Sequence, residues 1–293
     1  MESGGQDDLN QNEVIERFRI LEFKVKELHL EKIWNEFEAA GFQPILIKGW
    51  AAARVYPEPF RRQYTDVDLV IAPDRYREAL KFSREMAQKL PVDLHEGPRH
   101  LDDFSFEELY AGTVTEKCGS ARIRMLRPED HLRVLCVHWL TDGGAYREKL
   151  WDIYYAVDRR PSNFDWGRLL DKTSLRRRRW IVCTIGLAHK YLGLDIKDTP
   201  VAVEAKNLPG WLTRTVESEW ASEIKLIPLD MCRKDRKTFW QQLKKRIPPN
   251  PIHATVMEEG EFDKKFRFHY QIKNMVRRLV PFLKKRRSGS AAG

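Results

Sequence analysis

Apolar residues recur every three or four positions through residues 11–40, and this period predicts one long amphipathic helix or two shorter ones. Gly41 directly follows the stretch and is typical of a helix end. The apolar segment 44–49 then predicts a short strand that runs into a glycine turn. Residues 51–56 predict a short helix, which Pro57 ends because proline cannot continue it.

Strand and helix patterns alternate through the next part of the chain. Residues 66–72 predict a second strand, and Pro73 with Asp74 predicts the start of a helix that extends to about Lys89. Residues 91–96 predict a third strand and residues 121–126 a fourth. The front of the chain is therefore expected to combine a small sheet with helices.

Helical periods dominate from Pro128 onward. Helices are predicted at 128–141, 146–159, 164–172 and 176–192, and less regular helical patterns continue to residue 285. The fold class is thus α+β, with an α/β front and a helical back. The predicted organisation is an α/β domain with an N-terminal helix, a helical domain and a disordered tail, over residues 1–127, 128–285 and 286–293.

The composition is that of a globular protein, because 42% of the 293 residues are hydrophobic and 32% are charged. No apolar stretch approaches the roughly 18–20 residues of a membrane-spanning helix, and the polar N-terminal segment lacks the apolar core of a secretory signal. The four cysteines lie far apart and form no C-x-x-C pair, so we expect reduced thiols. Together these features predict a cytoplasmic protein.

Charge is distributed unevenly along the chain. Residues 171–293 hold 27 Lys and Arg against 13 Asp and Glu, a net +14, whereas residues 1–170 hold 25 against 30, a net −5. Four consecutive arginines stand in 175–180, and basic and aromatic residues are interleaved in 232–246 and 266–287. This mixture suits plain amphipathic helices with solvated basic faces, RNA binding, or an anionic membrane surface.

Candidate chemistry begins with two acids in the second predicted strand, "RRQYTDVDLVIAP" at 61–73. Successive side chains of a strand point to opposite faces, so Asp66 and Asp68 are expected to share one face. Two adjacent carboxylates repel each other, and a divalent cation such as Mg²⁺ resolves the conflict. The alternative is that the two acids only cap or turn the chain at the start of the strand.

Neighbouring residues favour the metal-binding interpretation. Lys48 and Gly49 lie in the turn after the first strand, where backbone N–H groups and a lysine charge suit phosphate oxygens. Arg62 lies just upstream of the acids and suits a bidentate phosphate contact. Asp93 lies in the third strand and comes close to the pair if the two strands are neighbours, and it then suits a general base and metal ligand. His95 shares the face of Asp93 and is expected to contact substrate or metal, or simply to form a half-buried hydrogen bond.

These motifs carry a resemblance to a known family. "ILIKGWAAARVYPEPFRRQYTDVDLVIA", followed by "VDLHE", resembles the nucleotidyltransferase-like proteins of the DNA polymerase β superfamily, and specifically a bacterial branch with K-G, Y-P-x-P, R-x-x-x-D-x-D-L-x-V and D-x-H motifs. The segment "LRPEDHLRVLCVHWLTDGG" is similar to the helices that follow in that branch. The resemblance covers about residues 40–160.

The resemblance implies a polymerase β-like core, which is a small mixed sheet flanked by helices. It also implies transfer of a nucleoside monophosphate from an NTP to an acceptor hydroxyl, with release of pyrophosphate and two Mg²⁺ (or Mn²⁺) ions. The acceptor is a small molecule, glycan, peptide or protein. The implied catalytic residues and metal ligands are Asp66, Asp68 and Asp93, and the implied nucleotide-binding residues are Lys48, Gly49, Arg62 and His95.

One departure affects triphosphate binding. The wider superfamily has Gly-Gly-Ser or Gly-Ser after the first strand, whereas this chain has Lys48-Gly49-Trp50 and offers no serine hydroxyl there. Two other functions remain open: an RNA- or tRNA-modifying, toxin-like nucleotidyltransferase that uses the basic back half, and a nucleotide-binding scaffold without catalysis. In the helix at 128–141, Glu129 and Asp130 are interpreted as acids that cap the first turn.

Overall fold

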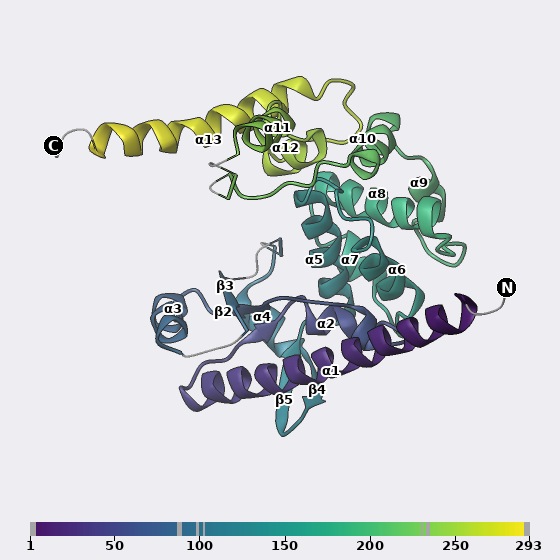
Figure 1. Cartoon of the computed structure of the whole chain (residues 1–293), viewed down its shortest axis with the longest axis vertical. Helices are drawn as coiled ribbons and strands as arrows, with labels where there is room; N and C mark the ends of the chain where they lie inside the picture. The colour runs from purple at the N-terminus through teal and green to yellow at the C-terminus, as the bar shows by residue number, and fades with distance from the viewer. Residues whose placement is uncertain are drawn as a thin grey trace. The chain divides into compact units, whose positions relative to one another are not determined.

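The computed structural model describes residues 4–86, 90–97, 100–101, 103–229, 231–232 and 235–289. The chain forms two compact units (Figure 1). The first unit contains residues 1–135 and 155–172, and the second contains residues 136–154 and 173–293. Each unit is therefore built from two separate segments of the sequence. The predicted single domain boundary at residue 127 stays a prediction.

The N-terminal segment is one continuous helix, α1 (Gly4–Ala39). Of the two predicted possibilities, one long helix or two shorter ones, the structure has the single long helix. Gly41 follows it with a positive φ of 78°, and the N–H of Phe42 donates to the carbonyl of Phe37 at 3.0 Å. Glycine adopts this left-handed conformation without steric cost, so the helix ends here. One face of α1 is buried in the core of the first unit, through Phe23, Leu30, Ile33, Trp34 and Phe37.

A mixed five-stranded sheet forms the centre of the first unit. Its strands are β1 (Ile45–Leu46), β2 (Val67–Ile71), β3 (Val92–Glu96), β4 (Val114–Cys118) and β5 (Ala121–Met125), in the order β3-β2-β1-β5-β4. The β2–β3 and β1–β5 pairs are parallel, whereas β1–β2 and β4–β5 are antiparallel. The predicted α+β class with a small mixed sheet is confirmed.

Strand β4 was not predicted from the sequence. It forms a hairpin with β5, and Gly119 in the turn has a φ of 60°. The segment "VTEKC" is an edge strand with largely exposed side chains, so it lacks the alternating apolar pattern of a half-buried strand. The Cys-Gly-Ser turn before β5 was the available signal.

Both faces of the sheet are covered by apolar side chains. On one face, Val67, Leu69 and Ile71 belong to the core that includes the inner side of α1, as their alternation predicted. On the other face, Val70 and Ile45 pack in a second cluster with residues of α4 (Phe106–Ala111). The strand period places Asp68 on this second face, beside Val70. The shorter elements of the unit are α2 (Trp50–Ala53), the 3-10 turn η1 (Pro59–Arg61) and α3 (Tyr76–Glu85).

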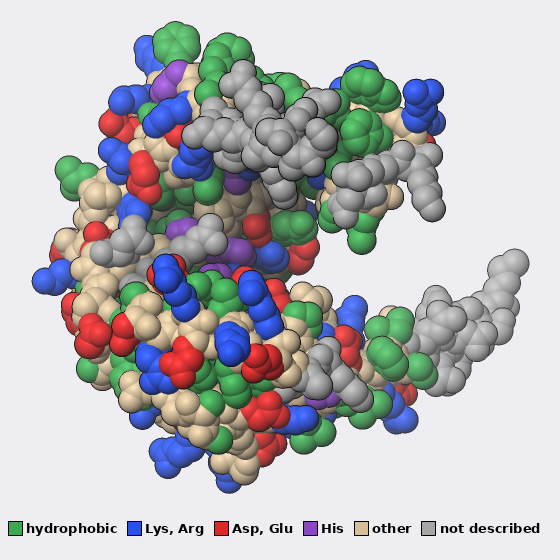
Figure 2. Space-filling view, turned by 90° about the vertical axis from the view of Figure 1, so that its left-hand side faces the viewer, with side chains coloured by type: hydrophobic (Ala, Val, Ile, Leu, Met, Phe, Trp, Pro, Cys, Tyr) green, Lys and Arg blue, Asp and Glu red, His purple; other side chains and the backbone are tan. Residues whose placement is uncertain are grey.

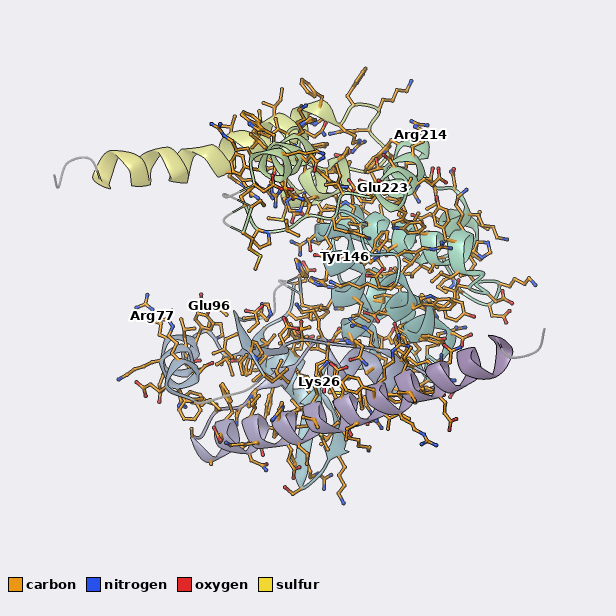
Figure 3. All side chains as sticks on the ribbon, in the orientation of Figure 1. Lys26, Arg77, Glu96, Tyr146, Arg214 and Glu223 are labelled. Carbon is orange, nitrogen blue, oxygen red and sulfur yellow. The ribbon has the colours of Figure 1, made fainter. Side chains whose placement is uncertain are left out.

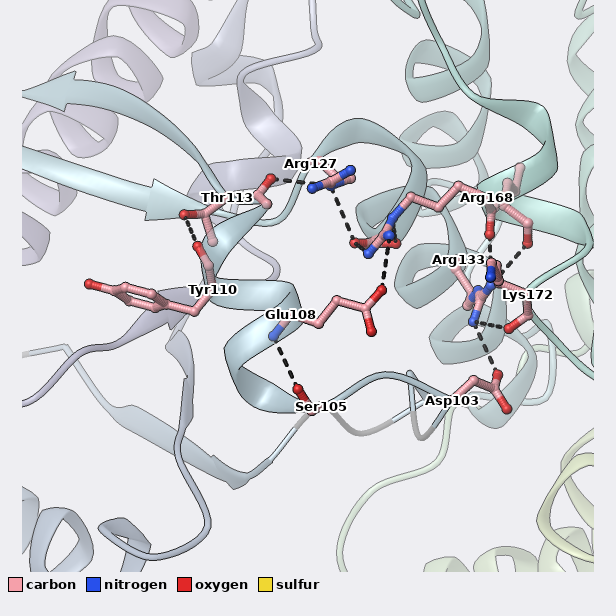
Figure 4. Close-up of polar contacts among 12 residues, drawn as sticks. Asp103, Ser105, Glu108, Tyr110, Thr113, Arg127, Arg133, Arg168 and Lys172 are labelled. Carbon is pink, nitrogen blue, oxygen red and sulfur yellow. Dashed lines mark hydrogen bonds and ion pairs between the residues drawn. The ribbon is translucent and has the colours of Figure 1, made fainter.

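A cluster of charged residues, the Arg168 cluster (Glu108, Asp130 and Arg168), joins α4, α5 (Pro128–Thr141) and α7 (Trp166–Leu170) (Figure 4). Arg168 donates to both carboxylate oxygens of Asp130, at 2.9 and 2.7 Å. Glu129 accepts from the backbone N–H of Asp165 at 2.9 Å. Both acids lie in the first turn of α5, where their capping role stays a prediction, and both also bind the α7 segment, a contact that the sequence did not predict.

The second unit is helical, as predicted. Helix α6 (Leu150–Asp158) contributes residues to both units. The remaining helices are α8 (Leu175–Leu192), α9 (Ala202–Lys206), α10 (Gly210–Ala221), α11 (Arg236–Arg246), α12 (Pro251–Met257) and α13 (Phe268–Gly289). Helix α13 extends into the segment predicted as a disordered tail, and residues 290–293 lie outside the described residues. Within the described residues, no helix combines the length and apolar character that crossing a membrane requires.

The arginine run that opens α8 is engaged in ion pairs within the second unit. Arg176 and Arg177 pair with Glu259, Arg178 pairs with Glu204, and Arg179 pairs with Asp263. On the face that Figure 2 shows, basic and acidic side chains are interspersed rather than gathered into one basic field. The run therefore serves helix packing in this structure.

Candidate functional site

Strands β2 and β3 bring the predicted acids together. The two strands pair in parallel, with Asp68 directly opposite Asp93 and Val70 opposite His95. Strand β3 ends at Glu96, which Figure 3 labels. Because alternate residues of a strand share a face and neighbouring strands lie about 4.8 Å apart, Asp68, Asp93 and His95 project from the same side of the sheet.

Close polar contacts link these side chains into the Asp68 cluster (Lys48, Asp68, Asp93 and His95). Oδ1 of Asp68 lies 2.6 Å from Nζ of Lys48 and 3.1 Å from Nε2 of His95. Nε2 of His95 also lies 3.5 Å from Oδ2 of Asp93. Ligand atoms of the two acids and the histidine all lie within 4.8 Å of one another. Side chains from β3 and from the turn after β1 thus converge on one carboxylate of β2.

The members of the Asp68 cluster differ in exposure. The side chains of Asp68 and His95 are 5% and 10% exposed, whereas that of Asp93 is 59% exposed. Burial by itself raises the pKa of Asp68. The hydrogen bond from His95 and the charge and hydrogen bond of Lys48 lower this pKa by more than burial raises it, so it lies below its ordinary value. Asp68 is therefore an ionised, buried carboxylate beside a second carboxylate that faces water.

The turn after β1 positions Lys48. The N–H of Ile47 donates to the carbonyl of Asp68 at 3.2 Å, so the chain continues alongside β2 beyond the end of the strand. Gly49 then turns the chain into α2 with a φ of 59°. A Cβ at this position would lie 3.3 Å from the carbonyl oxygen of Asp66, so glycine relieves both the backbone strain and the crowding.

Asp66 and Arg62 lie between η1 and β2. The strand begins at Val67, one residue later than predicted, and Asp66 is a half-buried residue in the bend before it. Asp66 is not part of the group of ligand atoms formed by the other two acids and His95. Arg62 donates to the backbone carbonyl of Gln63. The roles of both residues in catalysis or binding stay predictions.

The donor set at Asp68 fits a divalent cation. Two carboxylates and an imidazole are common ligands of first-row transition ions, and the carboxylates also suit Mg²⁺. For metal–ligand bonds of about 2.1 Å, neighbouring ligand atoms are separated by about 3.0 to 3.4 Å. The separations of 3.1 and 3.5 Å from Nε2 of His95 to the two carboxylates are close to this range.

Sequence reasoning assigned Lys48 and His95 to nucleotide binding and did not anticipate that both would contact Asp68. The available signal was positional: His95 lies two residues after Asp93 on the same strand face, and Lys48 follows the strand that pairs with β2. The contact required the pairing of β1, β2 and β3, which the sequence pattern leaves open.

Comparisons with known proteins agree with the sequence resemblance. Residues 24–87 match the sequence model of a family described as "Uncharacterised nucleotidyltransferase". The match includes α1 from Lys24, the Lys48-Gly49 turn and both acids of the D-x-D motif, and it confirms the resemblance to nucleotidyltransferases. None of the curated proteins matches the chain.

A solved structure also shows partial similarity. It is an antigenic nucleotidyltransferase-like protein from Paracoccidioides brasiliensis, with 12% sequence identity and a TM-score of 0.39. The similar region covers 57% of this chain and 89% of that protein. A likeness of this size carries no argument about activity.

Proposed function

We propose that the first unit catalyses the metal-dependent transfer of a nucleoside monophosphate from an NTP to an acceptor hydroxyl, with release of pyrophosphate. The observation that carries this proposal is the convergence of Asp68, Asp93 and His95 beside the Lys48-Gly49 turn. The match of residues 24–87 to a nucleotidyltransferase family supports the reaction class.

The carboxylates of Asp66, Asp68 and Asp93 are the proposed ligands of two divalent ions, Mg²⁺ or Mn²⁺. Such ions neutralise charge on the triphosphate and on the departing oxygen when they are bound. Lys48 occupies the space next to Asp68 and compensates its charge in the structure described here. Once a cation compensates Asp68, the ammonium group of Lys48 is available to a phosphate oxygen.

Asp93 is the proposed general base, because its carboxylate is the most exposed of the cluster. The acceptor oxygen forms a bond to the α-phosphorus, and the bond from that phosphorus to the oxygen bridging to the β-phosphorus breaks. Pyrophosphate leaves, and the acceptor proton passes to Asp93. Gly49 lets the backbone approach the phosphates closely, and Arg62 is the proposed second cationic contact.

The acceptor is proposed to be a small molecule, glycan, peptide or protein. An RNA acceptor is the alternative that the basic second half of the sequence raised. The pairing of all four arginines at the start of α8 removes one reason for it. RNA binding that weakens steeply with salt would favour RNA instead.

The proposal is tested with the purified full chain, each of the four labelled NTPs, and either Mg²⁺ or Mn²⁺. We expect metal-dependent binding of nucleotide and release of pyrophosphate, measured first without added acceptor and then with protein, glycan and tRNA acceptors. Asp68→Asn should lower turnover at least about 1,000-fold. Asp74→Asn, an exposed acid after the same strand, is the matched control and should leave turnover unchanged.

Two results would contradict the proposal. One is the absence of metal-dependent nucleotide binding with every NTP. The other is nucleotide binding and turnover that survive in Asp68→Asn. A protein that binds nucleotide but never releases pyrophosphate would favour the non-catalytic scaffold.

A further inference from the structure

Helix α1 has two apolar faces, and only one of them is covered. The inner face packs into the core of the first unit. A second set of apolar side chains, the outer stripe, is exposed to between 42% and 67%. It consists of Val14, Phe18, Leu21, Val25 and Leu28.

The outer stripe follows a heptad repeat, and the two other exposed apolar residues among the described side chains of α1, Ile15 and Ile20, lie outside that repeat. Its members are separated by four, three, four and three residues, which is the a/d spacing of a coiled coil. Phe18 and Val25 take the a positions, and the other three residues take the d positions. A valine at a and leucines at d favour two-stranded coiled coils.

The inner face cannot substitute for a partner of the outer stripe. Phe23 and Leu30 on the inner face each follow an outer-stripe leucine, Leu21 or Leu28, by two positions. At about 100° per residue these pairs point about 200° apart, on opposite sides of the helix. Rotating α1 to cover the stripe would therefore expose the inner core.

Charges beside the stripe favour a second copy of this chain as its partner. In the same heptad frame Arg17 takes a g position and Glu22 the following e position, and these meet across a parallel two-stranded coiled coil. In the single chain Arg17 pairs with Glu13 and Glu22 pairs with Lys26, each at 2.7 Å and four residues apart on α1. Pairs of this spacing contribute little stability, and Lys26 keeps its hydrogen bond to Gln63 when Glu22 changes partner.

We infer that the outer stripe is a dimer interface, in which the α1 helices of two copies form a short parallel coiled coil. The interface buries five apolar side chains per copy that the single chain leaves in water. The inference is independent of the proposed nucleotidyl transfer.

The first test is sedimentation velocity of the full chain over a concentration series. We expect the wild type to sediment at about twice its chain mass of 34.6 kDa. Leu21→Glu should raise the dissociation constant about 100-fold or more, because it places two carboxylates in the interface. The matched control Arg19→Gln changes the net charge by the same amount at an exposed position off the stripe and should remain dimeric.

The second test distinguishes the two helix directions. The four natural cysteines are buried, so a cysteine introduced as Val14→Cys is the reactive thiol. In the parallel dimer the two position-14 thiols face each other and form a disulfide under mild oxidation. In an antiparallel dimer position 14 faces position 28, and self-crosslinking fails.

Three outcomes overturn the inference: a wild type that stays monomeric at about 100 µM, a Leu21→Glu variant that stays dimeric, or Val14→Cys that does not crosslink to itself. Far-UV circular dichroism of each variant establishes that α1 is still folded. A monomeric wild type that floats with anionic lipid vesicles would assign the stripe to a membrane surface and would equally overturn the inference.

Discussion

The Arg168 cluster and the Asp68 cluster each contain one buried carboxylate in the first unit, and the negative charge of that carboxylate is compensated differently in the two clusters. Asp130 is 1% exposed, and Arg168 binds both of its oxygens. Burial by itself lowers the pKa of Arg168, but Asp130 and Glu108 raise it by more, so the guanidinium stays charged. In the Asp68 cluster the buried carboxylate instead shares one oxygen between Lys48 and His95.

The difference separates a structural ion pair from a site that is open to a ligand. The bidentate pair of Arg168 and Asp130 is completed by Arg127 and Glu108 from the same unit, and it connects helices far apart in sequence. The Asp68 cluster places a second carboxylate, 59% exposed, next to the buried one. Two neighbouring carboxylates, one of them exposed to water, repel each other, and an added cation reduces this repulsion.

Breaking the Arg168 cluster should have the largest effect on folding. Arg168→Met leaves the buried Asp130 with only the longer ion pair to Arg127, at 3.8 Å, and we expect the free energy of unfolding to fall by about 2–4 kcal/mol. Urea denaturation measures this change. The double variant Arg168→Met with Asp130→Asn removes the buried charge and should recover part of the loss. A loss below about 1 kcal/mol in the single variant would show that the pair does not anchor α7.

A substitution beside the Asp68 cluster should have the next largest effect. Gly49→Ala places a methyl group in a backbone conformation with φ of 59° and 3.3 Å from the Asp66 carbonyl oxygen, and should cost about 1–3 kcal/mol. The control is Gly41→Ala, which has a similar positive φ of 78° but no atom within 4 Å of the added methyl group. Equal unfolding free energies for the two variants would contradict the crowding argument.

The third prediction concerns the metal preference of the Asp68 cluster. Imidazole binds first-row transition ions better than Mg²⁺, so His95→Asn should reduce the preference for Mn²⁺ over Mg²⁺ about tenfold. Calorimetric titration of the nucleotide-free protein measures both affinities. Pulsed EPR of bound Mn²⁺ should show nitrogen coupling in the wild type and none in the variant. Coupling that persists in the variant would exclude His95 as the ligand.

A smaller effect is expected at a half-buried histidine of the second unit. Burial and the charge of Arg278 lower the pKa of His253. The hydrogen bond to the Thr141 carbonyl raises this pKa by a smaller amount, so the pKa lies below the ordinary histidine value. As the pH falls below the ordinary histidine value, the unfolded chain binds a proton that the folded chain excludes, so stability decreases. Denaturation at about pH 7.5 and about pH 5.5 should show a larger loss for the wild type than for His253→Gln. Equal losses would contradict the prediction.

The smallest effect on folding is expected where the Asp68 cluster meets water. Because the side chain of Asp93 is largely exposed, Asp93→Asn should change the free energy of unfolding by no more than about 0.5 kcal/mol. The same variant should lower nucleotidyl transfer at least about 100-fold if Asp93 is the general base. Parallel measurements of denaturation and pyrophosphate release check both. A large loss of stability would place Asp93 with Asp130 as a structural residue.

The sequence by itself determined the elements whose side chains follow a regular period. The three- and four-residue spacing predicted helix through residues 11–40, and the alternation of Val67, Leu69 and Ile71 predicted one of the two buried faces of β2. The Lys48-Gly49 turn and the D-x-D motif indicated the region of the candidate site and the resemblance to nucleotidyltransferases. These signals are local, since each arises from the geometry of one helix, strand or turn.

Only the tertiary structure decided which distant residues meet. The contacts of Asp68 with Lys48 and His95 depend on strand order, and the pairing of Asp130 with Arg168 depends on where α7 returns to α5. The sequence marks both faces of α1 as apolar, but folding buries one and leaves the outer stripe exposed. Burial and charge compensation depend on contacts between residues that are far apart in the sequence, and a local sequence pattern contains no information on such contacts.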